Sequence, residues 1–141
     1  MIGAIVMKMG VRRAWAAANR RDLDYLLRYV ADDAVMEVPG RPPVGGRFVG
    51  REAWRVGLER WQASLSSFRY RVIDVALKNP FALGLSNTIF TEFELEETAL
   101  DGRTVTVRGV DVSEMVRGKW VADRTYVFDL EAEETMRSAA P

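Results

Sequence analysis

Apolar side chains recur at helical spacing in the N-terminal half of the chain and at alternate positions in the C-terminal half. In the first segment, Val11, Trp15 and Ala18 follow one another at the intervals expected for one face of a helix. Residues 51–65 carry the clearest stripe of this kind, formed by Trp54, Leu58, Trp61 and Leu65. These two segments therefore predict helices that each bury one face.

The residues between these two segments predict a short helix, a short strand and a loop. Asp22 can cap the helix, whose inward face would consist of Leu23, Leu26, Leu27 and Val30. Residues 35–38, Val-Met-Glu-Val, are rich in β-branched side chains and predict a strand. Proline and glycine are frequent at 40–50, which indicates a loop.

After Ser66 the hydrophobic pattern changes to a period of two residues, which is typical of half-buried strands. Strands are predicted at roughly 68–78, 83–97, 104–116 and 120–130. The Asp101–Gly102 and Arg117–Gly118 pairs predict the turns of the last two hairpins. The last three strands should therefore pair in an antiparallel sheet.

The two ends of the chain are less regular. Residues 131–141 are polar and are expected to form a loose tail. The apolar run from Ile2 to Met7 has three interpretations: a frayed start, an extra strand or a contact between subunits.

Helices followed by a run of strands predict an α+β fold, with a curved antiparallel sheet packed against three N-terminal helices around a cavity. The 141 residues fit a single domain with its core at about 9–130.

Composition excludes several kinds of chemistry. The chain has no cysteine and no histidine, so thiolate metal sites, cysteine nucleophiles and Ser-His-Asp triads are absent. Basic and acidic residues balance at 20 each, without the basic excess of a nucleic-acid-binding protein. No segment resembles a signal peptide or a membrane span, so a cytoplasmic protein is expected. Catalysis would have to use carboxylates, Tyr, Lys, Arg or water, and neither a metal nor a cofactor is expected.

The alternation of side chains along the strands identifies candidate catalytic acids. In the strand at 104–116, Asp111 and Ser113 share a face with apolar residues, which places Asp111 in the expected cavity. Burial there would raise the pKa of Asp111 and keep it protonated as an acid. If Asp123 on the next strand also faces inward, the two carboxyl groups would form an acid–base pair. Glu92, Glu94 and Glu96 are interpreted as an outer stripe facing solvent or another subunit.

The chain resembles the superfamily of ketosteroid isomerase, SnoaL-like polyketide cyclases, limonene epoxide hydrolase and nuclear transport factor. The resemblance covers residues 9–130 and rests on the order and spacing of four segments: AWAAANRRDLDYLLRYVADDAVMEVPG, FVGREAW, RTVTVRGVDV and GKWVADRTYVFD. It implies a cone-shaped α+β fold with a cavity and frequent homodimers. Val110, Val112 and Val116 on the outer face of the sheet would supply the dimer contact.

The resemblance implies different things for different residues. Asp111 matches the proton-donating acid of ketosteroid isomerase, whereas Val38 and Ala14 match its base and its phenol. Against limonene epoxide hydrolase, the catalytic positions match Phe93, Leu95, Thr125, Val35 and Glu37. Asp123 lies one inward-facing step from Thr125, near the carboxylate that SnoaL-like cyclases use. Asp32 and Asp33 match the structural Asp-Asp pair that follows the second helix of this superfamily.

These observations predict an enzyme that performs acid–base chemistry on a small apolar or amphipathic molecule. The reaction would be an isomerisation, cyclisation, dehydration or epoxide opening. Asp111 would be the acid and Asp123 or Glu37 its partner base. The residues expected to bind the substrate are Trp15, Val38, Trp54, Phe93, Leu95, Ser113, Thr125 and Val127. The alternative is a small-molecule-binding or dimeric association domain of the same fold without catalysis.

Overall fold

The computed structural model describes residues 2–82 and 85–138. In these residues the helices are α1 (Ile2–Asn19), α2 (Leu23–Leu27), α3 (Arg51–Ala63) and α4 (Leu130–Ser138). The strands are β1 (Val30–Val38), β2 (Gly46–Val49), β3 (Leu65–Leu77), β4 (Ser86–Ala99), β5 (Thr104–Val116) and β6 (Lys119–Val127). The expected α+β architecture is confirmed, with the helices of the N-terminal half preceding the long strands.

The six strands form one curved sheet in the order β2-β1-β6-β5-β4-β3. Strands β3 to β6 pair with their sequence neighbours in antiparallel fashion. Strand β1, however, pairs parallel to β6, so the sheet is mixed, with one parallel pair beside the antiparallel pairs that were expected. A parallel pair needs a long connection, which α3 and the three strands from β3 to β5 provide here.

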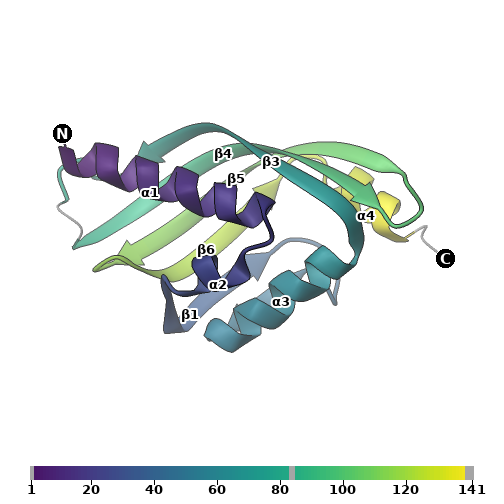
Figure 1. The fold of residues 1–141 in the computed structure, drawn as a ribbon, viewed down its shortest axis with the longest axis horizontal. Coiled ribbons are helices and arrows are strands. Elements are labelled where there is room, and N and C mark those ends of the chain that lie inside the picture. The colour runs from purple at the N-terminus through teal and green to yellow at the C-terminus, as the bar shows by residue number, and fades with distance from the viewer. Residues whose placement is uncertain (1, 83–84, 139–141) are drawn as a thin grey trace.

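Helices α1, α2 and α3 lie on the concave side of this sheet (Figure 1). Helix α1 packs mainly against β3, and α3 packs against β1, β2 and β3. The helix face predicted from Trp54 is confirmed, because Trp54 is buried and its Nε1–H donates to the Ala34 carbonyl oxygen at 3.1 Å. Asp22 caps α2 as expected, since its side chain accepts a hydrogen bond from the Tyr25 N–H at 3.0 Å.

The sequence-based boundaries differ from the structure at several places. Val30 is not the last residue of a helix face but the buried first residue of β1, which is longer than the predicted 35–38. The predicted loop at 40–50 contains β2, which pairs with β1 between Val38 and Gly46 and between Val35 and Val49. Local composition does not show this pairing, because a segment rich in glycine and proline is typical of a loop even where it pairs with the preceding strand.

Both ends of the described chain are helical. The apolar run from Ile2 belongs to α1, although Ile2, Ile5 and Val6 remain largely exposed. The expected loose tail is instead α4 as far as Ser138, because Met136 is buried against Leu65 and Ala99; residues 139–141 lie outside the described part of the chain. No helix within residues 2–82 and 85–138 is long and apolar enough to cross a membrane.

Candidate functional site

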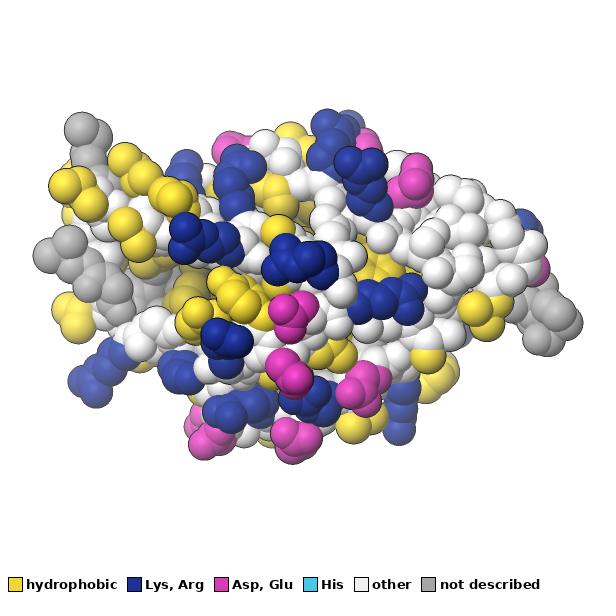
Figure 2. Space-filling model, in the orientation of Figure 1, with side chains coloured by type: hydrophobic (Ala, Val, Ile, Leu, Met, Phe, Trp, Pro, Cys, Tyr) yellow, Lys and Arg dark blue, Asp and Glu magenta, His cyan; other side chains and the backbone are white. Residues whose placement is uncertain are grey.

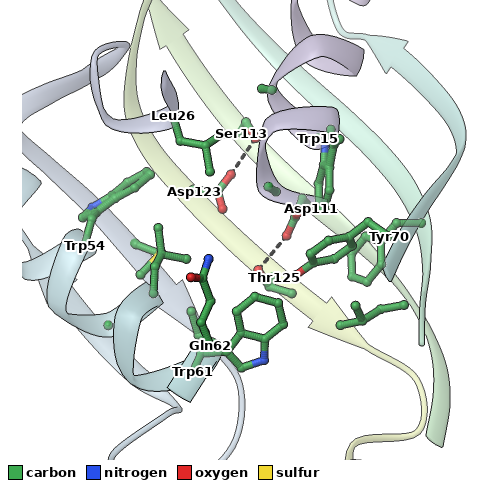
Figure 3. Close-up of a pocket in the computed structure, with 18 of the residues that line it drawn as sticks. Trp15, Leu26, Trp54, Trp61, Gln62, Tyr70, Asp111, Ser113, Asp123 and Thr125 are labelled. Carbon is green, nitrogen blue, oxygen red and sulfur yellow. Dashed lines mark hydrogen bonds between the residues drawn. The ribbon is translucent and has the colours of Figure 1, made fainter. Parts of the chain in front are cut away.

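A cavity of about 170 Å³ lies between the concave face of the sheet and the helices (Figure 3). Its lining is largely aromatic and aliphatic, and the aromatic members are Trp15, Trp54, Trp61, Tyr70, Phe93 and Trp120. Trp15 stacks on Phe93 with ring centroids 5.4 Å apart, and it meets Tyr70 edge-on at 4.5 Å. The site is therefore a preformed apolar space with few polar groups, as is usual for small-molecule sites.

Four polar side chains on β5 and β6 face this cavity. In the strand register, Asp111 lies opposite Thr125, and Ser113 lies opposite Asp123. The Thr125 hydroxyl donates to Asp111 Oδ1 at 2.6 Å, and the Ser113 hydroxyl donates to Asp123 Oδ1 at 2.5 Å. Each carboxyl group is thus held by a hydroxyl group of the neighbouring strand, so both acids are fixed in position inside the cavity.

The two carboxyl groups have different acidities. Burial raises the pKa of Asp111 well above the usual aspartate value, and the nearby charge of Asp123 raises it further. Burial also raises the pKa of Asp123, but only to about 6, because the Ser113 hydrogen bond and the Arg124 charge lower it. Asp111 is therefore the group of the pair that holds its proton more tightly and Asp123 the group that ionises first, which is the separation that acid–base catalysis requires.

Tyr70 on β3 adds a phenol to this part of the cavity. Burial raises its pKa well above the usual tyrosine value, and the charge of Asp111 adds to the effect. In Figure 3 the Tyr70 ring points toward the Asp111–Thr125 pair. A phenol held in the protonated state at neutral pH can donate a hydrogen bond to a ligand beside Asp111.

A second polar cluster lies where α4 meets the sheet. Arg137 pairs with Glu97 at 2.6 Å and also with Glu133, one turn earlier on α4. Trp61 Nε1–H donates to the same Glu97 oxygen at 2.8 Å. Glu97 is fully buried and Glu133 is 5% exposed, while Glu133, Arg137 and Trp61 line the cavity. Burial and the charge of Glu97 raise the pKa of Glu133 to about 7.

The structure brings most of the predicted site residues together. The following all line the cavity: Trp15, Val38, Trp54, Phe93, Leu95, Asp111, Ser113, Asp123, Thr125 and Val127. Glu37 is the exception, because it is exposed on β1 and pairs with Arg47 at 3.6 Å. The expectation that Glu37 reaches the cavity is therefore wrong, since alternation along β1 directs its neighbours Met36 and Val38 inward instead.

Sequence reasoning missed several residues in and beside the cavity that a pattern could have identified. Glu97 has the same strand parity as the inward-facing Leu95, so it belonged to the inner face of β4. Glu133 and Arg137 are four residues apart, the spacing of side chains that meet on one face of a helix. Tyr70 gave a weaker signal, because exposed arginines flank it on β3.

Among the described residues, no group of three or more acids is arranged to hold a metal ion. The outward stripe of β4 matches the prediction: Glu92 and Glu96 are exposed and Glu94 pairs with Arg71 at 3.0 Å. The polar side chains that line the cavity carry carboxyl, hydroxyl, phenol, amide, indole and guanidinium groups.

Several solved structures share this fold at low sequence identity. An NTF2-like protein of unknown function from Burkholderia pseudomallei superposes with a TM-score of 0.82 at 20% identity, over 99% of this chain and all of that chain (100%). TerC, co-crystallised with polyporic acid, gives 0.76 at 21% identity, with 97% and 99% covered. A putative polyketide cyclase from Xanthomonas campestris pv. campestris gives 0.66 at 19%, with 91% and 93% covered. At such identities these likenesses show the fold.

Among curated proteins, no sequence matches this chain. The family model of the SnoaL-like domain does match it, from residue 11 to residue 122. That range runs from α1 into β6, the strand that pairs with β5. It includes Asp111 on β5 and the part of β6 up to Ala122. The chain therefore belongs to the SnoaL-like domain family.

Proposed function

We propose that this protein is an enzyme that moves protons on a small, largely apolar substrate held in the cavity. The observation that supports this most directly is the pair of Asp111 and Asp123 inside an otherwise apolar cavity. Their different pKa values suit one group to donate a proton or hydrogen bond and the other to accept a proton. Perturbed carboxyl groups in a cavity are typical of catalytic sites.

The reaction that this geometry supports best is proton removal from a carbon next to a carbonyl group. Asp123, as the ionised partner, would take the proton from the carbon. Protonated Asp111 and the Tyr70 phenol would donate hydrogen bonds to the carbonyl oxygen while negative charge develops on it. Return of the proton from Asp123 to a different carbon completes an isomerisation, and attack of the carbanion on a second carbonyl would give a cyclisation.

Relatives by fold are consistent with this proposal. One neighbour is named a putative polyketide cyclase, and TerC was crystallised with polyporic acid. The same scaffold hosts many activities, so the argument rests on the residues of this cavity. Here the family match adds support for a small organic molecule as the ligand.

Carbon-bound hydrogen exchange tests the proposal without knowledge of the natural substrate. The probe is 2-tetralone in D₂O, whose exchange next to the carbonyl is followed by proton NMR with and without the protein. We expect the wild type to accelerate exchange. The exchange rate with Asp123→Asn should be lower than that with the wild type by about 10²–10⁴-fold, and Asp111→Asn should also lower the rate. Asp33→Asn is the matched control, because Asp33 is an exposed aspartate on β1.

A non-catalytic small-molecule-binding or dimeric association domain is the alternative. It is favoured by the residues at the ketosteroid-isomerase base and phenol positions, Val38 and Ala14, which cannot transfer protons. The alternative would be supported, and the enzymatic proposal contradicted, if the wild type binds 2-tetralone but exchanges it no faster than the Asp111→Asn/Asp123→Asn double variant does.

A further inference from the structure

The charges that line the cavity are unequal. Among the described lining residues the acids are Asp111, Asp123 and Glu133, while Arg137 is the one side chain with a permanent positive charge. Arg137 is already engaged by Glu97 and Glu133. An anionic ligand group would therefore find no free cation among these lining residues, whereas a cationic group would find Asp111 and Asp123 on the sheet (Figure 3) and Glu133 on α4.

The cluster at α4 has an excess of buried hydrogen-bond acceptors. Glu97 Oε2 and Glu133 Oε2 are buried and accept no hydrogen bond from a donor of the described residues, and Arg137 Nε is a third buried atom without a partner. The two carboxyl groups share one guanidinium group, and a protonated Glu133 can donate a hydrogen bond to Glu97. The cluster therefore carries one more negative than positive group above the Glu133 pKa of about 7. A buried carboxylate oxygen without a partner is costly, which makes this a place where a ligand group that donates hydrogen bonds would be stabilised.

Aromatic rings stand next to the same cluster. Trp61 donates to Glu97, and its ring packs with Phe68 at 4.4 Å and with Tyr70 at 5.9 Å between centroids. Aromatic faces attract ammonium groups, and the attraction increases when water is excluded. The acceptors and the rings thus favour the same kind of group, a cation with N–H donors.

We propose that Glu133, together with Glu97, forms a second polar subsite of the cavity that binds a protonated amine of the ligand. The substrate would then be an alkylamine that carries an aromatic ring and a carbonyl group. Its reacting carbonyl would lie at Asp111 and Asp123 while its ammonium group lies at α4. The ammonium group donates to Glu133 Oε2 and balances the extra negative charge that Arg137 leaves. This assignment rests on the proposed function, because it names the substrate class of the same cavity.

Four small probes of equal shape test the assignment: 2-phenylethylammonium, 2-phenylethanol, phenylacetate and propylbenzene. Their dissociation constants are measured at pH 8 by ¹H–¹⁵N NMR titration, with the Trp61 indole N–H as the signal nearest the subsite. At this pH the Glu133 carboxyl group, with its pKa of about 7, is largely ionised. We expect the ammonium probe to bind at least tenfold more tightly than the alcohol and phenylacetate to bind most weakly.

Glu133→Gln should reduce the preference for ammonium over alcohol to less than threefold, while its side chain can still accept a hydrogen bond from Arg137. Glu131→Gln, at an exposed position of the same helix, should keep the preference. Equal affinity for ammonium and alcohol, a preference unchanged in Glu133→Gln, or no binding of any probe would each overturn the assignment. If the wild type does not accelerate 2-tetralone exchange but still prefers the ammonium probe, the catalytic proposal is contradicted and the amine subsite is not.

Discussion

Asp111 and Asp123 lie on neighbouring antiparallel strands, and each accepts a hydrogen bond from a hydroxyl group of the other strand. The two pairs are adjacent in the register, so the acids lie diagonally rather than directly opposite each other. This arrangement keeps two buried carboxyl groups in one cavity without forcing them into direct contact. It also leaves the second oxygen of each carboxyl group for a ligand.

Replacement of Asp123 should stabilise the protein at neutral pH. Because the folded-state pKa of about 6 exceeds the usual aspartate value of 3.8, the folded protein binds the proton more tightly than the unfolded chain. Stability is therefore lost as pH rises from about 4 through about 6. We expect Asp123→Asn to raise the free energy of unfolding by about 1–3 kcal/mol at pH 7 and to change it little at pH 3.5. Urea unfolding at both pH values measures this, and parallel wild-type and variant pH curves would contradict it.

The pH dependence of 2-tetralone exchange should follow the same pair. Exchange requires ionised Asp123, so kcat/KM should rise with pH through about 6. It should fall again at higher pH, where Asp111 loses the proton that its raised pKa retains. In Asp111→Asn the fall at high pH should disappear, provided that activity remains measurable. A rate that is constant between pH 5 and pH 7 would exclude Asp123 as the base.

The inner face of β5 could be predicted from the sequence because alternation is a local property of one strand. Asp111 and Ser113 followed from the parity of Val107 and Gly109, and the register with β6 then placed Thr125 and Asp123 beside them. A period-two pattern fixes which side chains share a face, whatever the strand pairs with. The polar centre of the candidate site was therefore accessible before the structure.

Strand β2 and helix α4 depend on contacts with other elements of the fold, which the composition of their own segments does not show. Strand β2 lies in a segment rich in glycine and proline and exists through its pairing with β1. Helix α4 is stabilised by the burial of Met136 and by the Arg137–Glu97 ion pair with β4. Without the sheet, the sequence from 131 onward has only the composition of a polar tail. Strand parity and helical spacing could have identified Glu97, Glu133 and Arg137 one by one, but their meeting in one cluster depends on the packing of α4 against the sheet.

Gly109 should be intolerant of any side chain. It lies between Phe93 on β4 and Val127 on β6, and an added Cβ would lie 2.7 Å from Phe93 Cζ and 2.3 Å from the Tyr126 carbonyl oxygen. Displacing a buried ring and backbone in this way typically costs about 1–3 kcal/mol. We therefore expect Gly109→Ala to lower the free energy of unfolding by at least that amount. Because Phe93 lines the cavity, 2-tetralone should also bind more weakly.

Gly10 provides the control for this substitution. It lies within α1, and an added Cβ there meets nothing within 4 Å. Alanine is the better helix former by about 1 kcal/mol, so Gly10→Ala should raise the free energy of unfolding. Opposite signs for the two Gly→Ala substitutions in the same urea-unfolding experiment would support the close contact at β5. Equal effects would contradict it.

Removal of the Trp61 indole N–H should expose the cost of the buried Glu97 carboxylate. Trp61→Phe keeps an aromatic ring on the cavity face of α3 but removes the 2.8 Å hydrogen bond to Glu97 Oε1, which leaves Arg137 as the remaining donor to that side chain among the described residues. A buried charged group that loses a partner typically costs about 1–3 kcal/mol, beyond the loss of ring volume.

Trp54→Phe is the matched control, because Trp54 donates to a backbone carbonyl oxygen instead of a carboxylate. We expect the Trp61 variant to lose more stability than the control at pH 8. The difference should shrink at pH 4, where Glu133, with its pKa of about 7, is protonated and can itself donate a hydrogen bond to Glu97. Urea unfolding of both variants at the two pH values measures this, and a difference that does not change with pH would show that ring packing alone explains the loss.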